Sequence, residues 1–405
     1  MNKIGKMSSI KRKGERRVKK RIKSALNDVS RLEWNLLASV IFLCCFGSIM
    51  IYSISGSLSE LGKHLKFMAF GFVFIIVFQY MNYHILAKLV FLIYGVGITS
   101  ILGLLTPLGV ERNGATRWLN IGGFQFQVAE AVKVAVIIML AWFVWHYYGV
   151  QKKIMLTLYL WALGGIPAIL LLKISNDLSS SLVILGITFM TTLTCLDTLK
   201  LHFIIFLCVG IVAGVYIWSI YIDMPSPTEI DKLPFREQRI AAWINPEMYA
   251  DNQGYQTLQA LYAIGSGGFT GKGLGKSVQK YDRLPEAHND MVLAIVAEEL
   301  GVFGILIIVI LMLMILYLVF LVAAGSEKSI FGRVLAVGIF FHFAIQGIIN
   351  MAVVCGVFPN TGLPFPFISS GGTSLLCCMA EIGIVVSIER RSVILRVKKQ
   401  ILEEG

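Results

Sequence analysis

Ten apolar runs of membrane-spanning length constrain the fold of this chain more than any other feature of its sequence. The hydrocarbon core of a bilayer is about 30 Å thick, and a helix needs about 20 apolar residues to cross it. Hydrophobic residues fill 56% of the 405 positions and charged residues only 15%, which excludes an ordinary soluble domain. The sequence therefore predicts an all-α polytopic membrane protein with ten transmembrane helices. The runs lie near residues 34–54, 64–80, 84–105, 129–148, 154–173, 178–196, 199–221, 290–323, 330–356 and 366–388.

Basic residues gather at both ends of the chain. Residues 1–33 hold 12 Lys and Arg against 3 Asp and Glu, so this tail carries +9 of the net charge of +12. A second basic segment, ERRSVILRVKK, follows the last run. Beside a membrane span, such segments more often fix orientation and contact anionic lipid than bind nucleic acid. We therefore expect cytoplasmic termini, with a disordered tail over 1–33, a membrane domain over 34–390 and a short tail over 391–405.

The positive-inside rule places the one long loop, residues 222–289, outside the membrane. The regular spacing of apolar residues in this loop indicates that it is structured and is not a linker. REQRIAAWINP and GYQTLQALYAIGSGG each have the spacing of a short amphipathic helix, and such helices lie on a membrane surface or cover a cavity. The sequence predicts a structured extracytoplasmic loop that covers an intramembrane groove.

The most informative stretch is 265–301, which begins glycine-rich and basic and then passes into a long apolar helix. Asp290 stands where the polar loop enters the membrane, and a carboxylate that is costly to keep there is a candidate for chemistry. Asp290 would also suit the N-terminus of the helix as a cap. The neighbouring His288, the acidic Glu298 two turns further on, and the basic loop upstream favour the chemical interpretation.

The basic loop contains repeated glycines with Lys272 and Lys276 among them. This composition predicts either a flexible backbone that approaches a bulky anion or a mobile surface loop. The spacing does not fit a Walker motif, and no strand is expected before it, so we predict no nucleotide cofactor.

A second polar group surrounds the start of the fourth run. Arg117 lies on the outer side, where positive charge is normally depleted, so it either snorkels or forms a loop ion pair, or it binds an anion such as phosphate. Glu130 and Lys133 form an i, i+3 pair within the apolar run. They either neutralise each other or line a polar cavity that opens outward.

The ninth run carries His342, Gln346 and Asn350 at intervals of four, which places them on one helical face. Hydrogen bonds between helices explain this polar stripe without a ligand. The segment that follows, PNTGLPFPFISSGGTS, is broken by proline and glycine. It predicts a re-entrant turn that is covered by protein or lines a cavity.

Three blocks of the sequence resemble the SEDS family of FtsW, RodA and SpoVE, which are ten-span peptidoglycan glycosyltransferases. The blocks are LYAIGSGGFTGKGLGKSVQK, LPEAHNDMVLAIVAEELG and TGLPFPFISSGGTS. NGATRWLNIGGFQFQVAEAVK resembles the external loop and fourth span of the family, and the similarity covers essentially residues 34–390. Departures from the family pattern are QVAE without proline before Glu130, SNDL in place of QPDL, and Ser370 in place of tyrosine. The run KSVQK looks more like the FtsW/SpoVE branch than RodA.

The resemblance implies which residues carry the reaction. Asp290 matches the aspartate of the PExHxD block, which is regarded as catalytic in the family. Arg117, Glu130 and Lys133 match the charged positions of the external loop and fourth span, and Gln346 with Asn350 matches a QxxxN pair in the ninth span. The implied substrate is lipid II, and the implied reaction builds β-1,4 glycan with inversion, with Asp290 taking the proton of the acceptor 4-hydroxyl. Cations to stabilise the departing pyrophosphate are expected among Arg117, Lys133, Arg239, Lys272 and Lys276.

The sequence shows no set of metal ligands. All seven cysteines lie in or beside apolar runs, which favours packing over disulfides or a metal site. A divalent cation, Mg²⁺ or Mn²⁺, would nevertheless help the expected reaction by bridging the pyrophosphate.

Two other functions suit the same features. A flippase for a lipid-linked precursor would also use intramembrane acids, although no inverted repeat is visible and the polar groups gather on the outer side. The chain would otherwise be a non-catalytic scaffold for a class B penicillin-binding protein, the transpeptidase. The resemblance implies such a partner in any case, together with other divisome or elongasome membrane proteins in the bacterial cytoplasmic membrane. Division, elongation and sporulation are not distinguished.

Overall fold

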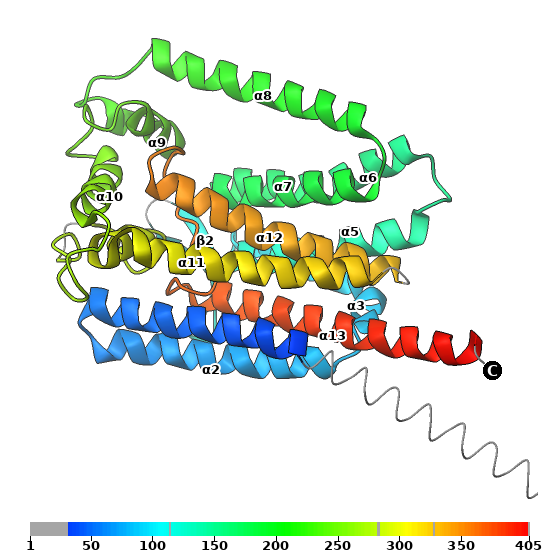
Figure 1. The fold of residues 1–405 in the computed structure, drawn as a ribbon. Helices are drawn as coiled ribbons and strands as arrows, with labels where there is room; N and C mark the ends of the chain where they lie inside the picture. Colours follow the sequence, from blue (N-terminus) through cyan, green and yellow to red (C-terminus); the bar gives the residue numbers. More distant parts are fainter. Residues whose placement is uncertain (1–30, 113–114, 282–283, 327–328, 404–405) are drawn as a thin grey trace, which may run out of the picture.

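The computed structural model describes residues 31–112, 115–281, 284–326 and 329–403. The predicted disorder of residues 1–33 therefore falls almost wholly outside the described residues. Long helices run alongside one another and form most of the molecule, as predicted (Figure 1). A first helix covers Arg31–Ser55. It is followed by α2 (Leu58–Tyr80), α3 (His84–Lys88), α4 (Val90–Gly103), α5 (Val128–Tyr147), α6 (Lys153–Ile174), α7 (Leu178–Cys195), α8 (Leu199–Ile222), α9 (Phe235–Ile244), α10 (Gly254–Gly267), α11 (Val292–Gly325), α12 (Ile330–Val354) and α13 (Gly372–Glu403).

Nine of the described helices are long and apolar enough to cross a membrane, so the chain is a multi-pass membrane protein. The remaining predicted span, near 84–105, is divided between α3 and α4. Helix α4 has 14 residues, which at 1.5 Å per residue is shorter than the hydrocarbon core. The count of ten crossings therefore stays a prediction. The last helix begins at Gly372 rather than near residue 366, because Pro364 and Pro366 keep the preceding segment out of a helix.

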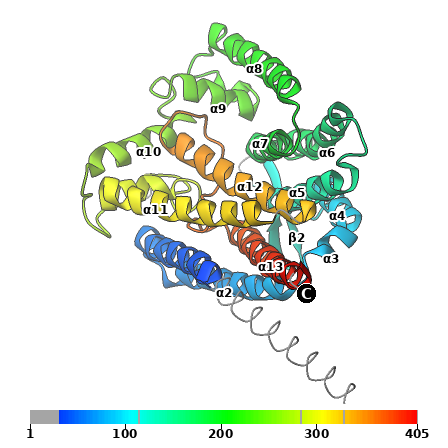
Figure 2. The same cartoon turned by 45° about the vertical axis from the view of Figure 1, so that its right-hand side comes forward.

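Helix α5 lies at the centre of the bundle and α8 lies at its edge. The apolar part of α5 is 72% buried, whereas that of α8 is only 6% buried. Helix α5 contacts α4, α6, α7 and α12, while α13 packs along α2 and α11 packs along α12. Both views show α8 apart from the other long helices (Figures 1 and 2). The side chains that approach α5 are therefore shielded from lipid.

The two ends of the membrane domain meet on one side of the bundle. Arg390 of α13 forms a bidentate ion pair with Glu33 of the first helix, in which Nη2 lies 2.7 Å from Oε2. The first helix begins its described course near Glu33, and α13 continues past Arg390 to Glu403, while the other ends of the two helices are Ser55 and Gly372. Residue 31 and the C-terminal part of α13 therefore lie on the same side, away from the long loop between α8 and α11.

A small antiparallel sheet, which the sequence analysis did not predict, precedes α5. Its strands are β1 (Gly109–Arg112), β2 (Ala115–Ile121) and β3 (Phe124–Gln127), in the order β1-β2-β3. Ile121 pairs with Phe124, so Gly122 and Gly123 alone form the turn, with φ of 59° and 87°. A two-residue turn with two positive φ angles matches the twist of a hairpin and favours glycine. The sheet brings Arg117, in the middle of β2, to the end of the bundle where α9 lies.

The long loop contains α9 and α10, at the positions where amphipathic helices were predicted. Beyond α10 the chain returns to α11, which is interrupted at Gly301 with φ of 64° and ψ of −158°. The interruption frees backbone groups that pair with the segment after α10: Lys272 N donates to Glu298 O and Val302 N to Gly268 O. The first two turns of α11 are thus held against the loop.

Candidate active site

Asp290 lies two residues before α11, in the lining of a cavity. Its side chain is only 4% exposed. The backbone oxygen of Asp290 accepts a hydrogen bond of 2.7 Å from Asn350 Nδ2, and Asn350 also donates to Leu363 O at 2.7 Å. Asn350 of α12 therefore ties Asp290 to the non-helical segment before α13. No donor within the described parts of the chain reaches Asp290 Oδ1, so this oxygen is left for a ligand or water.

Two arginines approach Asp290 from other elements. A Cβ added to Gly362 would lie 3.7 Å from both Arg117 Nη1 and Asp290 Oδ2, so both side chains lie close to this glycine. Gly362 has φ of 71°, a conformation that favours glycine. Arg239 of α9 donates from Nη1 to Asn360 O at 3.0 Å, which holds it on the same segment.

These side chains line a cavity of about 310 Å³, called here the Asp290 cavity. Its walls come from β2, from α9 and α10, from the segment before α11 and from the segment before α13. Ser370 N donates to His288 O at 3.0 Å, which joins the last two segments. The lining residues are Arg117, Trp118, Gln127, Arg239, Gln256, Glu286, His288, Asn289, Asp290, Gly362, Pro364, Ser370, Gly371 and Gly372.

The electrostatics of the cavity suit proton transfer near neutral pH. Burial, helped by the nearby Glu286, raises the pKa of Asp290 from 3.8 to about 7, against the opposing effect of Arg239 and Arg117. Burial and the proximity of Arg117 lower the pKa of Arg239 to about 10, so this guanidinium still carries its charge. A carboxyl whose pKa lies near the working pH is suited to act as a general base.

Glu130 and Lys133 lie beneath the cavity in a fully buried polar cluster. Lys133 Nζ donates to Glu130 Oε1 at 2.8 Å and to Gln346 Oε1 at 2.5 Å. His342 Nε2 lies 3.0 Å from the same Gln346 oxygen, and its Nδ1 lies 2.9 Å from Glu381 Oε2. Each of these side chains is 0% exposed. Ionisable groups within membrane-spanning helices are tolerated when they face the interior of the bundle and pair with one another, as these do.

His342 joins the cluster through both ring nitrogens. Gln346 Nε2 donates to Pro364 O at 3.0 Å, so the amide oxygen of Gln346 faces His342 Nε2. Nδ1 faces the Glu381 carboxylate. The predicted polar stripe therefore makes hydrogen bonds between helices and also supports Pro364, a wall of the Asp290 cavity.

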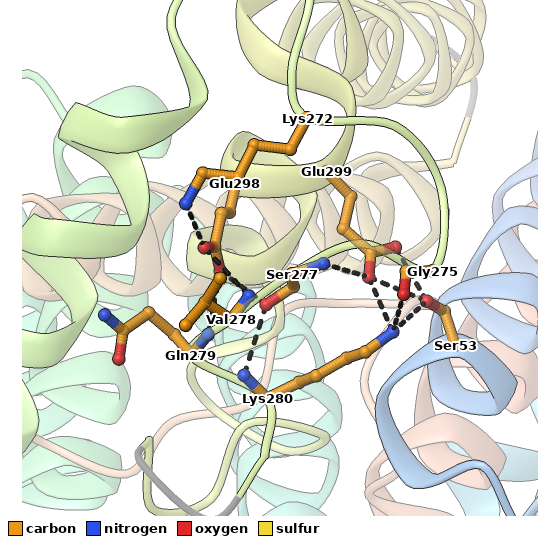
Figure 3. A network of polar contacts seen from close by, with 9 residues as sticks. All are labelled: Ser53, Lys272, Gly275, Ser277, Val278, Gln279, Lys280, Glu298 and Glu299. Atoms are coloured by element: carbon orange, nitrogen blue, oxygen red, sulfur yellow. Dashed lines mark hydrogen bonds and ion pairs between the residues drawn. The ribbon is translucent and has the colours of Figure 1, made fainter.

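The structure does not bring Glu298, Lys272 or Lys276 to the Asp290 cavity. Glu298 is buried and accepts from Lys272 Nζ at 2.6 Å, from Ser277 Oγ and from Val278 N at 3.0 Å (Figure 3). Lys276 is exposed beside this network. The glycine-rich segment is thus fastened to α11, in place of the flexible anion-binding or mobile loop that its composition suggests.

Sequence comparison matches the FtsW/RodA/SpoVE cell cycle proteins over residues 33–393 of this chain. The chain belongs to this family. A relative from Trichlorobacter lovleyi, named probable peptidoglycan glycosyltransferase FtsW, is 33% identical over 370 residues, which are 87% of this chain and 92% of the relative. The protein of the same name from Bacillus subtilis is 32% identical, with 88% and 90% covered. Stage V sporulation protein E of Bacillus subtilis is 30% identical, with 88% and 96% covered.

Solved structures share the fold of this FtsW/RodA/SpoVE protein. The rod shape determining protein RodA of Thermus thermophilus superposes with a TM-score of 0.61 at 22% identity, covering 88% of this chain and 96% of that chain. A chain from a peptidoglycan synthase complex that coordinates polymerization and crosslinking superposes with a TM-score of 0.69 at 23% identity, covering 89% and 98%. The likeness extends over nearly the whole membrane domain.

Sequence reasoning missed several residues of the site in this family member. Arg236 of α9 donates to Leu172 O at 3.0 Å and to Asn176 Oδ1 at 3.3 Å, and it lines a small pocket with Arg117 and Arg239. Arg236 and Arg239 are three residues apart on an amphipathic helix, so the sequence could have placed both on the same helical face. Glu381 was also missed, although an acid inside the last apolar run is itself a reason to look for a buried partner.

Proposed function

We propose that this peptidoglycan glycosyltransferase polymerises lipid II at the Asp290 cavity, on the outer face of the bacterial cytoplasmic membrane. The observation that carries the proposal is a buried carboxylate with one unoccupied oxygen, facing a cavity that two arginines also line. Such an arrangement pairs a base with a cationic site for a leaving phosphate.

In the proposed reaction, Asp290 takes the proton from the 4-hydroxyl of the acceptor sugar. The hydroxyl oxygen then bonds to the anomeric carbon of the donor, on the face opposite the pyrophosphate. The bond between that carbon and the pyrophosphate oxygen breaks, and its electron pair leaves with the pyrophosphate. The product linkage is β-1,4 because the anomeric centre inverts. Asp290 returns its proton to solvent through the open mouth of the cavity.

Arg117 and Arg239 would stabilise the charge that develops on the leaving pyrophosphate. Guanidinium groups bind phosphate oxygens in a bidentate way, and both are held by backbone carbonyls, Asn176 O and Asn360 O. Removing one preorganised donor of this kind from an active site lowers kcat by about 10²-fold to 10³-fold. Glu130 and Lys133 act from below by supporting the cavity, since both are fully buried.

A divalent cation fits this site as a companion of the substrate. Mg²⁺ is commonly held by one or two carboxylates together with substrate phosphates, and Asp290 and Glu286 both line the cavity. Mg²⁺ or Mn²⁺ bound there would neutralise pyrophosphate charge. Within the described ranges no three His, Cys, Asp or Glu side chains gather as a metal site, so such an ion would depend on substrate oxygens. Titration of activity with EDTA and added Mg²⁺ tests this dependence.

The decisive experiment is polymerisation of purified lipid II by the purified full-length protein. We expect the parent protein to form glycan polymer and Asp290→Asn to form none, because asparagine cannot accept the proton. Asp251→Asn, an exposed aspartate on the outer loop, serves as the control and should polymerise normally. An Asp290→Asn protein that polymerises at the parental rate would exclude the role of Asp290 as base.

We further propose a class B penicillin-binding protein as partner, because a structure of this fold comes from a complex in which polymerization and crosslinking are coordinated. Named relatives include FtsW and stage V sporulation protein E, which favours a role in division or sporulation. A fluorescent fusion that collects along the side wall instead of at septa would contradict this part of the proposal.

A further inference from the structure

A second cavity lies on the other side of the segment that leads to Asp290. It has a volume of about 760 Å³, more than twice that of the Asp290 cavity. One wall is the end of the first helix, from Tyr52 to Gly56, and the opposite wall comes from Gly275, Lys280, Tyr281 and residues 284–288. Glu286 and His288 line both cavities. The two cavities are therefore neighbours with a shared wall, and Asp290 follows this wall by two residues.

The chemistry of the second cavity differs from that of the first. Tyr52 and Tyr281 have side chains that are 47% and 70% exposed, and Ser53 and Ser55 also line the cavity. Lys280 is the only Lys or Arg among the described residues that line it. An uncharged ligand with hydroxyls and apolar ring faces suits such a surface, since aromatic side chains offer a flat apolar face beside polar groups.

The one lysine is already committed to the protein. Lys280 Nζ lies 3.0 Å from Glu299 Oε1 and 2.8 Å from Gly275 O, and its side chain is only 5% exposed (Figure 3). Glu299 also accepts from Ser53 Oγ at 2.7 Å, so Glu299 links Lys280 of one wall to Ser53 of the other. Lys280 Nζ lies 5.4 Å from the centre of the Tyr281 ring, which helps to hold that ring at the cavity. Among the described residues that line the second cavity, there is no arginine pair comparable to Arg117 and Arg239.

The proposed reaction needs room for two saccharides. A volume of about 310 Å³ is at the lower end of the range for a single bound small molecule. The arginines of the Asp290 cavity suit the pyrophosphate-linked sugar that reacts. The remainder of the glycan, whose sugars lie away from the pyrophosphate, must extend out of that cavity. A space of sufficient size and of matching chemistry lies across Glu286 and His288, which line both cavities.

We propose that the second cavity binds the growing glycan, with N-acetylated β-1,4-linked sugars stacked on Tyr52 and Tyr281. This inference rests on the proposed function and adds to it a strand-holding site. A bound strand dissociates more slowly between additions, because affinity differences of this kind act mainly on dissociation. The length of the glycan made in one encounter therefore depends on the two tyrosines.

The test compares product lengths made by the full-length protein from lipid II, at equal consumption of substrate. Tyr52→Ala and Tyr281→Ala should each shorten the strands by about fivefold, the factor expected for losing one aromatic contact. Tyr52→Phe and Tyr281→Phe keep the rings and should restore most of the length. Tyr262→Ala removes an exposed tyrosine of α10 that does not line either cavity, and it should change nothing.

A second measurement uses a phosphate-free probe, the β-1,4-linked tetramer of N-acetylglucosamine. Saturation-transfer NMR should detect its binding to the parent protein and to Asp290→Asn, and should lose it in the Tyr52→Ala/Tyr281→Ala double variant. Unchanged strand lengths in both alanine variants, or tetramer binding that persists in the double variant, would overturn the inference; the tyrosines would then be interface anchors only. A parent protein that makes no polymer would instead refute the proposed function, so the two failures are distinguishable.

Discussion

At the scale of single residues, the environment of Asp290 sets both its reactivity and its cost to the fold. The carboxyl is buried beside Glu286, and the two arginines only partly offset these effects, so its pKa rises from 3.8 to about 7. In the folded state the group therefore keeps its proton through a pH range in which the unfolded chain has lost it. The same shift that prepares the base for proton transfer must weaken the folded protein when the group is ionised.

The first prediction follows from the sign of this shift. Between about pH 4 and pH 7 the folded protein binds more protons than the unfolded chain, so its stability falls as pH rises through this window. Asp290→Asn removes the ionised form. We expect its melting temperature in detergent to exceed that of the parent at about pH 8 and to equal it at about pH 4. The corresponding gain in the free energy of unfolding at about pH 8 is at most about 4 kcal/mol. Asp251→Asn serves as the control for loss of an aspartate. If Asp290→Asn and the parent had the same melting temperature at both pH values, the raised pKa of Asp290 would be contradicted.

The second prediction concerns the arginines. Arg117→Ala and Arg239→Ala should each lower kcat for lipid II polymerisation by about 10²-fold to 10³-fold, because each removes a fixed donor for the leaving pyrophosphate. Lys66→Ala, an exposed basic residue of α2, should leave kcat unchanged. Steady-state kinetics with melting curves for each variant separates lost chemistry from lost folding. A rise in KM with kcat preserved would mean that the arginines bind substrate without acting on the transition state.

At the scale of elements, the break in α11 is what fastens the glycine-rich segment to the bundle. Gly301 turns out of the helix with φ of 64°, and this exposes the carbonyls of Glu298 and Glu299 to the backbone of residues 272–273. Two buried acids then hold two lysines, Lys272 and Lys280. The segment from α10 to Asp290 therefore has defined anchors on α11.

The third prediction tests this break with a single methyl group. Gly301→Ala would place a Cβ 2.5 Å from Gly271 N and still closer to Phe269 O, at a positive φ. We expect a loss of about 2 kcal/mol or more, since both backbone strain and a clash are introduced. Gly210→Ala, in α8 with nothing within 4 Å of the new Cβ, should be neutral or stabilising by up to about 1 kcal/mol. Thermal unfolding in detergent measures both, and a Gly301→Ala protein as stable as the parent would show that the break is not required.

The same elements show what the sequence could and could not predict. Apolar runs predicted the long helices because span length is a property of contiguous residues. The amphipathic spacing of α9 and α10 was readable for the same reason. The strands around Arg117 were missed because β1 and β3 have four residues each, too few to show a period.

The periodicity of the sequence does not predict which residues that are far apart in the chain come into contact. Asp290 could be singled out from its position at the start of an apolar run. Its neighbours Arg117 and Arg239 are far away in sequence, and only folding brings them to one cavity. Lys272 was expected near an anionic ligand, whereas its partner is Glu298, 26 residues further on. A pattern of charges predicts that partners exist, and the packing of α10 on α11 decides which they are.

At the scale of the whole molecule, the described helices give the protein two distinct ends. The Asp290 cavity, the sheet and the loop between α8 and α11 occupy one end. The Glu33–Arg390 ion pair and the turn between α5 and α6, which carries Lys152 and Lys153, occupy the other. Basic residues normally remain in the cytoplasm, so the charge distribution predicts that the cavity faces outward.

The fourth prediction checks this orientation in intact cells with a membrane-impermeant maleimide. Glu247→Cys places a thiol on the outer loop after α9, and Lys152→Cys places one on the opposite turn. We expect Glu247→Cys to be labelled in intact cells and Lys152→Cys only after permeabilisation, with the parent protein and its seven cysteines as the background. The reverse result would put the Asp290 cavity in the cytoplasm, where the exported saccharide of the proposed reaction is absent. The outer location of the chemistry therefore depends on the same charge asymmetry that orients the helices.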